Sequence, residues 1–236
     1  MRVMLALFFV HVSVGQEWQS ANHVAVYGHA FKNTKSFAWG ASSTFVQRAN
    51  DLAAHDLDIY QFGVYTGGTM MSMHRRIKSY RRMWGFDSFQ GLPEETKGLR
   101  IEGRHWRPGG FSSKGALGAK TPEEAMHQVT VKIGNPNATL IQGFFNESLP
   151  KMDLSSCRPA LLVDVDSDLY VSAKEALTWL FKHRIARVGT LIRYDDWNIG
   201  DPSWGEAKAH KDISDEFGVT FRSFRRNEFE VMAIAQ

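Results

Sequence analysis

The sequence is poor in the residues on which several enzyme classes depend. It has one cysteine, Cys157, which excludes an intrachain disulfide and a cysteine-based zinc site. Its nine histidines include no His-x-x-x-His pair for zinc on a helix, which argues against a zinc hydrolase. Its apolar runs are too short to cross a bilayer comfortably, so we expect no stable membrane span.

The sequence also lacks a strong excess of charge of one sign. The formal net charge is +3 and the pI is near 9.0. Apart from the stretch RRIKSYRR at residues 75–82, the basic residues are dispersed. We read that stretch as a solvated helix end and expect no nucleic-acid partner.

The length of 236 residues, with 43% hydrophobic and 22% charged residues, suits one α/β domain with a full core. Residues 1–15, MRVMLALFFVHVSVG, have the outline of a secretory signal peptide, which would direct the protein to the secretory pathway. The basic region is minimal and His11 interrupts the apolar run, so a buried N-terminal segment of a cytoplasmic protein is the alternative. We assign residues 16–236 to a single domain.

Helix-like and strand-like segments alternate from residue 45 onward. Helical spacing or capping signals favour helices at residues 44–56, 72–81, 121–133 and 172–184. β-rich runs favour strands at residues 58–65, 82–88, 138–145, 159–166 and 188–195. This alternation predicts a mostly parallel sheet with helices on both faces. Two further β-type runs, at 219–226 and 229–236, predict a C-terminal antiparallel hairpin, and residues 90–120 read as one long surface loop.

Aspartates follow the apolar run of one predicted strand at every second position. In LLVDVDSDLY they are Asp164, Asp166 and Asp168, which would share one face if the strand continued through them. Such a cluster repels itself, so protons, basic side chains or a bound cation must offset its charge.

A second strand, ending in LIRYDDW, delivers Asp195 and Asp196 to the same edge of the sheet. Carboxylates that converge without histidine or thiol partners suit a hard divalent cation such as Mg²⁺. The alternative is that these aspartates cap helices or pair with Arg193 or Lys174.

A glycine-rich turn follows the first predicted strand, in FGVYTGG. It lacks the Gly-Lys-Ser/Thr ending of a phosphate loop. Asp87 ends the next strand roughly twenty residues later, where an acid can accept hydrogen bonds from ribose hydroxyls. Together these features favour a nucleoside-containing cofactor, although a plain turn capped by Asp87 is the simpler alternative.

These motifs resemble the macrocin O-methyltransferase (TylF-type) group of class I S-adenosylmethionine-dependent methyltransferases. FGVYTGG resembles its first cofactor motif, GFDSFQGLPEE its second-strand segment and LIQGFFNESLP its third-strand block. DVDSDLYVSAKEAL and YDDW resemble its metal-site pair, and GEAKAHKDISDEF the helix that follows. The resemblance runs from about residue 58 to 235. It implies a Rossmann-like α/β sandwich with a mostly parallel seven-stranded sheet and a C-terminal antiparallel hairpin.

The resemblance also implies roles for individual residues. The magnesium ligands of the family match Asp166, Asp195 and Asp196, and its proposed general base matches Asp168. Asp164 has no counterpart with a role. Its cofactor-binding positions match Gly63, Tyr65 and Gly67 around the methionine part of S-adenosylmethionine, and Asp87 on the ribose. One position departs from the family pattern, which usually has an acid in place of Gln61. Arg193, inside the last predicted parallel strand, is also unusual and could either pair with a neighbouring acid or face solvent.

The function implied is S-adenosylmethionine-dependent, divalent-metal-assisted O-methylation of a small hydroxylated acceptor: a sugar, a glycoside or a catechol-like group. A catalytically inactive cofactor- or carbohydrate-binding protein of the same fold is the main alternative, because Gln61 removes a charge from the cofactor site. A nucleotide-dependent oxidoreductase is a weaker one, because two acid-rich strand ends would be unexplained.

Overall fold

The structure, a computed structural model, describes residues 39–99, 106–197 and 203–235. The predicted signal peptide at residues 1–15 lies outside the described residues. None of the helices in the described ranges is long and apolar enough to cross a membrane.

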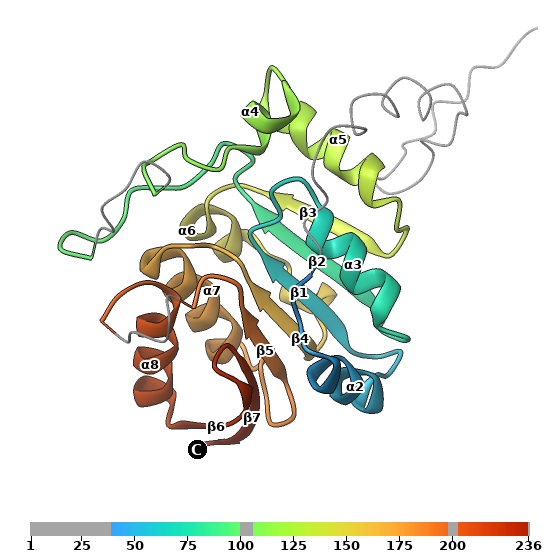
Figure 1. Cartoon of the computed structure of the whole chain (residues 1–236), viewed down its shortest axis with the longest axis vertical. Helices are drawn as coiled ribbons and strands as arrows, with labels where there is room; N and C mark the ends of the chain where they lie inside the picture. Colours follow the sequence, from blue (N-terminus) through green and yellow to red (C-terminus); the bar gives the residue numbers. More distant parts are fainter. Residues whose placement is uncertain (1–38, 100–105, 198–202, 236) are drawn as a thin grey trace, which may run out of the picture. The chain divides into compact units, whose positions relative to one another are not determined.

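The strands form one seven-stranded sheet in the order β3-β2-β1-β4-β5-β7-β6 (Figure 1). The pairs among β1 to β5 are parallel, whereas β7 runs antiparallel to both β5 and β6. This topology confirms the predicted fold class and the C-terminal hairpin. The strands are β1 (Asp58–Phe62), β2 (Arg82–Asp87), β3 (Ala138–Gln142), β4 (Ala160–Val165), β5 (Leu191–Tyr194), β6 (Val219–Arg225) and β7 (Glu228–Ile234).

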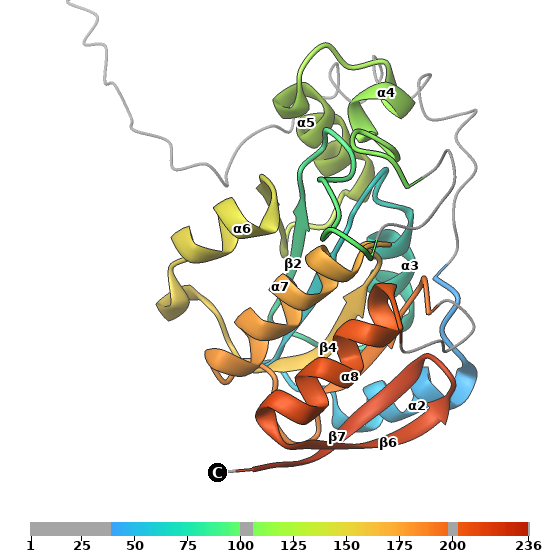
Figure 2. The ribbon, with the colours of Figure 1, turned by 90° about the vertical axis from the view of Figure 1, so that its left-hand side faces the viewer.

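Helices cover both faces of the sheet (Figure 2). One hydrophobic core packs α7 (Tyr170–Lys182) and α8 (Gly205–Phe217) against one face. A second core packs α2 (Ser43–Leu52), α3 (Gly68–Arg76) and α5 (Pro122–Ile133) against the other. The strands at the centre are buried on both faces, which explains their continuous apolar runs.

The helix α5 begins where the sequence predicts. The Thr121 hydroxyl accepts a hydrogen bond from the Glu124 N–H at 3.2 Å, and Pro122 occupies the first helical position. The Glu124 carboxylate in turn accepts from the Lys120 N–H at 2.7 Å. These contacts satisfy N–H groups that otherwise have no partner at a helix start.

Two predicted segments are wrong in detail. The helix expected at residues 72–81 is α3, which begins earlier, directly after Gly67, and ends at Arg76 because Ile77 turns into an extended conformation and is buried. The loop expected at residues 90–120 contains the short helix α4 (Ser113–Leu117), capped by Ser112 and ended by Gly118. Further short helices missed from the sequence are α6 (Phe145–Ser148), η2 (Leu149–Lys151) and η3 (Leu154–Ser156).

Two arginines of the basic stretch at residues 75–82 make contacts within the fold. Arg76 donates to the carbonyl oxygens of Trp39 and Ala41 at 2.9 and 3.0 Å. Arg81 pairs with Asp58 at 2.7 Å. These two arginines therefore stabilise the fold.

Candidate active site

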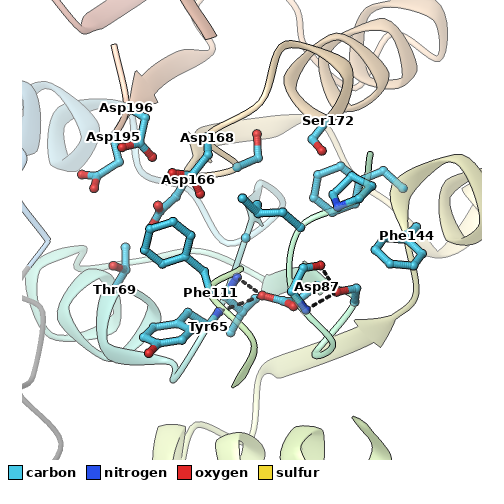
Figure 3. A pocket seen from close by; sticks show the side chains of 18 of the residues that line it. Tyr65, Thr69, Asp87, Phe111, Phe144, Asp166, Asp168, Ser172, Asp195 and Asp196 are labelled. Atoms are coloured by element: carbon cyan, nitrogen blue, oxygen red, sulfur yellow. Dashed lines mark hydrogen bonds between the residues drawn. The ribbon is translucent and has the colours of Figure 1, made fainter. Parts of the chain in front are cut away.

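A cavity of about 250 Å³ lies beyond the carboxyl ends of β1, β2, β4 and β5. In open α/β sheets this edge is where ligands bind. Figure 3 shows Asp166, Asp168, Asp195 and Asp196 gathered on one side of the cavity and Asp87 apart from them. The glycine turn, the loop after β2 and the acidic strand ends supply its walls, including Gly63, Tyr65, Gly68, Asp87, Leu92, Pro93, Phe111, Phe144, Asp166, Asp168, Ser172, Asp195 and Asp196.

The glycine turn needs glycine at two positions for different reasons. Gly63 has φ +88°, and a Cβ there would lie 1.7 Å from the Asp166 carbonyl oxygen, so only glycine lets β1 pass this close to the end of β4. Gly67 has φ +77° and precedes α3. A Cβ on Gly67 would approach Val129 and Ile133 of α5 at 3.0 Å. Gly63 and Tyr65 line the cavity, whereas Gly67 packs against α5 and does not.

Asp87 holds the glycine turn in place. Its Oδ2 accepts from the N–H groups of Val64 and Tyr65, each at 2.8 Å, and its Oδ1 accepts from the Phe89 N–H at 2.5 Å. Burial raises the pKa of Asp87, although these three hydrogen bonds act in the opposite direction. Asp87 therefore caps the turn, as in the simpler sequence-based alternative, and it also lines the cavity.

Gln61 lies inside the sheet beneath this turn and is fully buried. Its Nε2 donates to the Gly63 carbonyl oxygen at 2.8 Å. Its Oε1 is buried and has no hydrogen-bond partner among the described residues. Gln61 does not line the cavity, so it acts on the site through the shape of the turn.

The strand β4 does not continue through the three alternating aspartates. β4 ends at Val165, and Asp168 has φ +61°, so the expectation that all three carboxylates leave one face of a strand is wrong. Asp164 lies within the strand and is fully buried. Its Oδ1 accepts from the Trp39 indole at 2.8 Å and from Arg193 at 3.0 Å.

Arg193 supplies part of the charge that offsets the cluster. This buried side chain lies opposite Asp164 in the pairing of β4 with β5. It also pairs with Asp195 at 2.5 Å. Of the two sequence-based alternatives for Arg193, the structure shows the ion pair. Lys174, the other proposed partner, pairs instead with Glu216.

One carboxylate oxygen from each of Asp166, Asp195 and Asp196 lies within 4.8 Å of the others. Burial and the charges of Asp195 and Asp164 raise the pKa of Asp166 well above its ordinary value. Burial and the charges of Asp168 and Asp195 raise the pKa of Asp196 to about 7. A set of close oxygen donors that repel one another fits a hard divalent cation.

Asp168 lies beside this group and lines the same cavity. Its Oδ1 accepts from the Trp106 indole N–H at 3.0 Å. Burial raises the pKa of Asp168 to about 6, although the bond from Trp106 opposes that shift. A carboxylate with a pKa this close to neutrality suits proton transfer.

Three residues that hold this site together were assigned no role from the sequence. Trp106 binds Asp168 from the loop after β2. Glu95, within the quoted GLPEE motif, accepts from the N–H groups of Tyr170 and Val171 at 2.7 and 3.1 Å and so caps α7. Glu206 accepts from the N–H groups of Ser167 and Asp196 at 3.0 and 2.9 Å. The signal for Glu95 was an acid without an assigned role in a segment that resembles the family's second-strand segment, and for Glu206 an acid in the first turn of a helix.

Comparison with known proteins identifies the family of this chain. Residues 47–218 match the family described as Macrocin-O-methyltransferase (TylF). No curated protein matches the chain significantly. The calicheamicin methyltransferase CalS11 is similar in structure, with a TM-score of 0.58 and 18% identity over 90% of this chain and 80% of that chain. The O-methyltransferase NovP gives a TM-score of 0.54 and 20% identity over 81% of this chain and 78% of that chain. At these identities the two structures support the fold.

The family match covers most of the chain, and the protein therefore belongs to the macrocin-O-methyltransferase (TylF) family of S-adenosylmethionine-dependent O-methyltransferases.

Proposed function

We propose that this enzyme methylates a hydroxyl group of a small sugar-like acceptor and that it does so with a divalent cation, for which Mg²⁺ is the first candidate. The observation that carries the proposal is that one cavity is lined both by the glycine turn and by the acids at the ends of β4 and β5. A methyl donor held at the turn and an acceptor held at the acids would then meet in the same space.

The first part of the proposal concerns the cofactor side of the cavity. The turn from Gly63 to Gly68 offers backbone without side chains at its point of closest approach to β4. Gly63 and Tyr65 would lie along the methionine part of the cofactor, and Asp87 would accept from the ribose. Gly67 would contribute by allowing the turn and the packing of α3 against α5. Because Asp87 already accepts from Val64 and Tyr65, binding of the ribose and the shape of the turn would depend on the same carboxylate.

The second part concerns the acidic side. Asp166, Asp195 and Asp196 would hold the cation, with Asp195 shared between the cation and Arg193. When bound, S-adenosylmethionine supplies an electrophilic methyl group and a divalent cation makes a nearby hydroxyl more acidic. Asp168 would accept the proton of the acceptor hydroxyl. The acceptor oxygen would bond to the methyl carbon as the bond from that carbon to sulfur breaks, which leaves S-adenosylhomocysteine and the methyl ether. Trp106 would fix the direction of the Asp168 carboxylate.

The nature of the acceptor follows from the cavity walls and from the relatives. Phe111 and Phe144 line the cavity together with polar side chains, and Phe111 is 46% exposed. Apolar rings and carboxylates in one cavity suit a ring that has both an apolar face and hydroxyl groups. The family name refers to macrocin, and CalS11 is a calicheamicin methyltransferase, which supports a sugar or glycoside acceptor here. A catechol-like acceptor would meet the same chemical requirements.

The test is incubation with methyl-labelled S-adenosylmethionine, Mg²⁺ and a panel of sugars, phenols and macrolide-like glycosides. We expect label transfer to a hydroxyl of at least one glycoside, and loss of transfer when EDTA removes the metal. Transfer that survives EDTA would contradict the metal part of the proposal. Tight cofactor binding without transfer to any acceptor class would favour the alternative of an inactive binding protein.

A further inference from the structure

A buried glutamate joins the two strand ends that carry the acids. Glu206 is the second residue of α8 and is fully buried. Its Oε1 accepts from the N–H of Ser167 at 3.0 Å, and its Oε2 accepts from the N–H of Asp196 at 2.9 Å. One carboxylate thus spans the loop after β4 and the loop after β5.

The two N–H groups are placed where small shifts would change the site. Ser167 lies between Asp166 and Asp168, and the carboxylate of Asp196 itself belongs to the acidic cluster. Neither N–H takes part in the hydrogen bonds that join β4 to β5, which end with the bond from the Asp195 N–H to the Val165 carbonyl oxygen at 2.9 Å. Beyond that point Glu206 is the link that the described residues provide between the backbones of the two loops.

The position of Glu206 is costly, which argues that the link matters. A buried carboxylate is unfavourable unless hydrogen bonds compensate it. A glutamine of the same size has one acceptor oxygen in place of two, so it could not accept from both N–H groups in this geometry.

We propose that Glu206 is a positioning residue that sets the separation of Asp166 and Asp196 and holds Asp168 toward the acceptor. This inference rests on the proposed function, because it concerns the site in which those aspartates act. Glu206 would act through the backbone of the two loops, as outer residues around metal sites orient the ligands themselves.

The variant Glu206→Gln tests this role, because it keeps the size of the side chain but turns a donor toward one of the two N–H groups. We expect the Kd for Mg²⁺ to rise about 10–100-fold, the range found for residues that orient metal ligands. We expect kcat to fall while the calorimetric Kd for S-adenosylmethionine stays within about twofold, since Glu206 contacts neither Asp87 nor the glycine turn. Glu216→Gln, on the same helix and 49% exposed, is the matched control and should leave both quantities unchanged.

The variant Glu206→Asp separates bridging from charge. It keeps the carboxylate but shortens the side chain by one methylene, so it cannot reach both N–H groups at once. A bridge predicts that Mg²⁺ affinity falls in Glu206→Asp as well. Parent-like Mg²⁺ affinity in this variant would show that Glu206 acts only through its charge and would overturn the proposal, as would parent-like Mg²⁺ affinity and kcat in Glu206→Gln.

Amide hydrogen exchange in the unmodified protein tests the bridge even if the variants do not fold. We expect slow exchange at the Ser167 and Asp196 N–H groups, although both lie outside the helices and strands. Fast exchange at both would overturn the bridge. This readout needs neither metal nor turnover, so it separates failure of the bridge from failure of the proposed function, which the EDTA experiment on the parent enzyme reports.

Discussion

Buried acids lie at both ends of the central strands, one at the amino end and a cluster at the carboxyl end, and they are held in opposite ways. At the amino end of β1, one buried carboxylate is surrounded by donors. Asp58 accepts from both the Nε and Nη2 of Arg81, from the Trp84 indole at 2.9 Å and from the N–H groups of Arg82 and Arg158, each at 3.1 Å. Its charge is therefore fully compensated by the fold itself.

At the carboxyl ends of β4 and β5 the balance is reversed. Within the described ranges, Arg193 binds Asp164 and Asp195, but no basic side chain forms an ion pair with Asp166, Asp168 or Asp196. Burial and like charges raise the pKa of each of these three acids. Buried carboxylates that the protein compensates are typical of structural sites, whereas carboxylates left in repulsion beside a cavity are typical of functional ones. The comparison predicts that substitutions at the two ends will separate stability from activity.

The largest effect is expected at Asp168. Asp168→Asn keeps the shape of the side chain but removes the proton acceptor, so turnover should fall about 10²–10⁴-fold. Affinity for Mg²⁺ and S-adenosylmethionine and the melting temperature should stay close to those of the parent. Turnover, calorimetry and thermal unfolding on this one variant decide the point. Full activity would remove Asp168 as the base, and loss of Mg²⁺ binding would reassign it as a ligand.

The reverse pattern is expected at Asp58. Asp58→Asn leaves the Arg81 charge without its partner, and breaking a buried ion pair costs about 3–5 kcal/mol. Chemical unfolding should show this loss, while turnover per folded molecule stays near the parent value at low temperature. Asp215→Asn, at an exposed ion pair with Lys211, is the control and should change stability by less than about 0.5 kcal/mol. If Asp58→Asn instead abolished turnover without lowering stability, the contrast between the two ends would be wrong.

A smaller effect is expected at Asp87, which both holds the glycine turn in place and lines the cavity. Asp87→Ala should weaken S-adenosylmethionine binding by roughly 1–3 kcal/mol, because the N–H groups of Val64 and Tyr65 lose their acceptor and the ribose loses its partner. The melting temperature should fall as well. Asp153→Ala, which removes only a local turn contact with Ser155, should leave cofactor affinity unchanged in the same calorimetric assay. Unchanged affinity in Asp87→Ala would count against the cofactor placement.

The smallest effect concerns pH. The pKa values of Asp168 and Asp196, about 6 and about 7, lie above those of an unfolded chain, about 3.9. The metal-free folded state therefore binds more protons than the unfolded state between about pH 4 and pH 7, and its free energy of unfolding should contain a contribution that falls as pH rises through this window. Mg²⁺ binds the ionised carboxylates. At five times its Kd it should therefore raise the free energy of unfolding by about 1 kcal/mol at pH 8, and by less at pH 5. Equal shifts of melting temperature at both pH values would contradict this.

Much of the fold could be predicted because its signals are local. The capping residues of α5 lie within four positions of one another, and each central strand is a short apolar run with turn residues beside it. The start of α3 was missed because the helix begins inside a glycine pair: Gly68 is its first residue, and the start depends on the left-handed conformation of Gly67. The five residues of α4 are too few to show helical periodicity.

The part of the site formed by acids at strand ends could be predicted from the sequence. The part that depends on contacts between residues far apart in the chain could not. Asp166, Asp195 and Asp196 lie together because the carboxyl ends of β4 and β5 are neighbours. Asp164 instead pairs with Arg193, and this contact depends on the register of β4 and β5, which the sequence does not reveal. Trp106 and Asp168 are 62 positions apart, and no local pattern in the sequence relates them.

The central claim is that the acids at the carboxyl ends of β4 and β5 form a cation site. The most direct measurement is calorimetric titration of Mg²⁺ into the parent protein and into Asp166→Asn combined with Asp196→Asn, with Asp215→Asn as the control. We predict saturable binding of Mg²⁺ to the parent and to the control and no binding to the double variant. A parent that binds no Mg²⁺, or a double variant that binds it as the parent does, would contradict the claim.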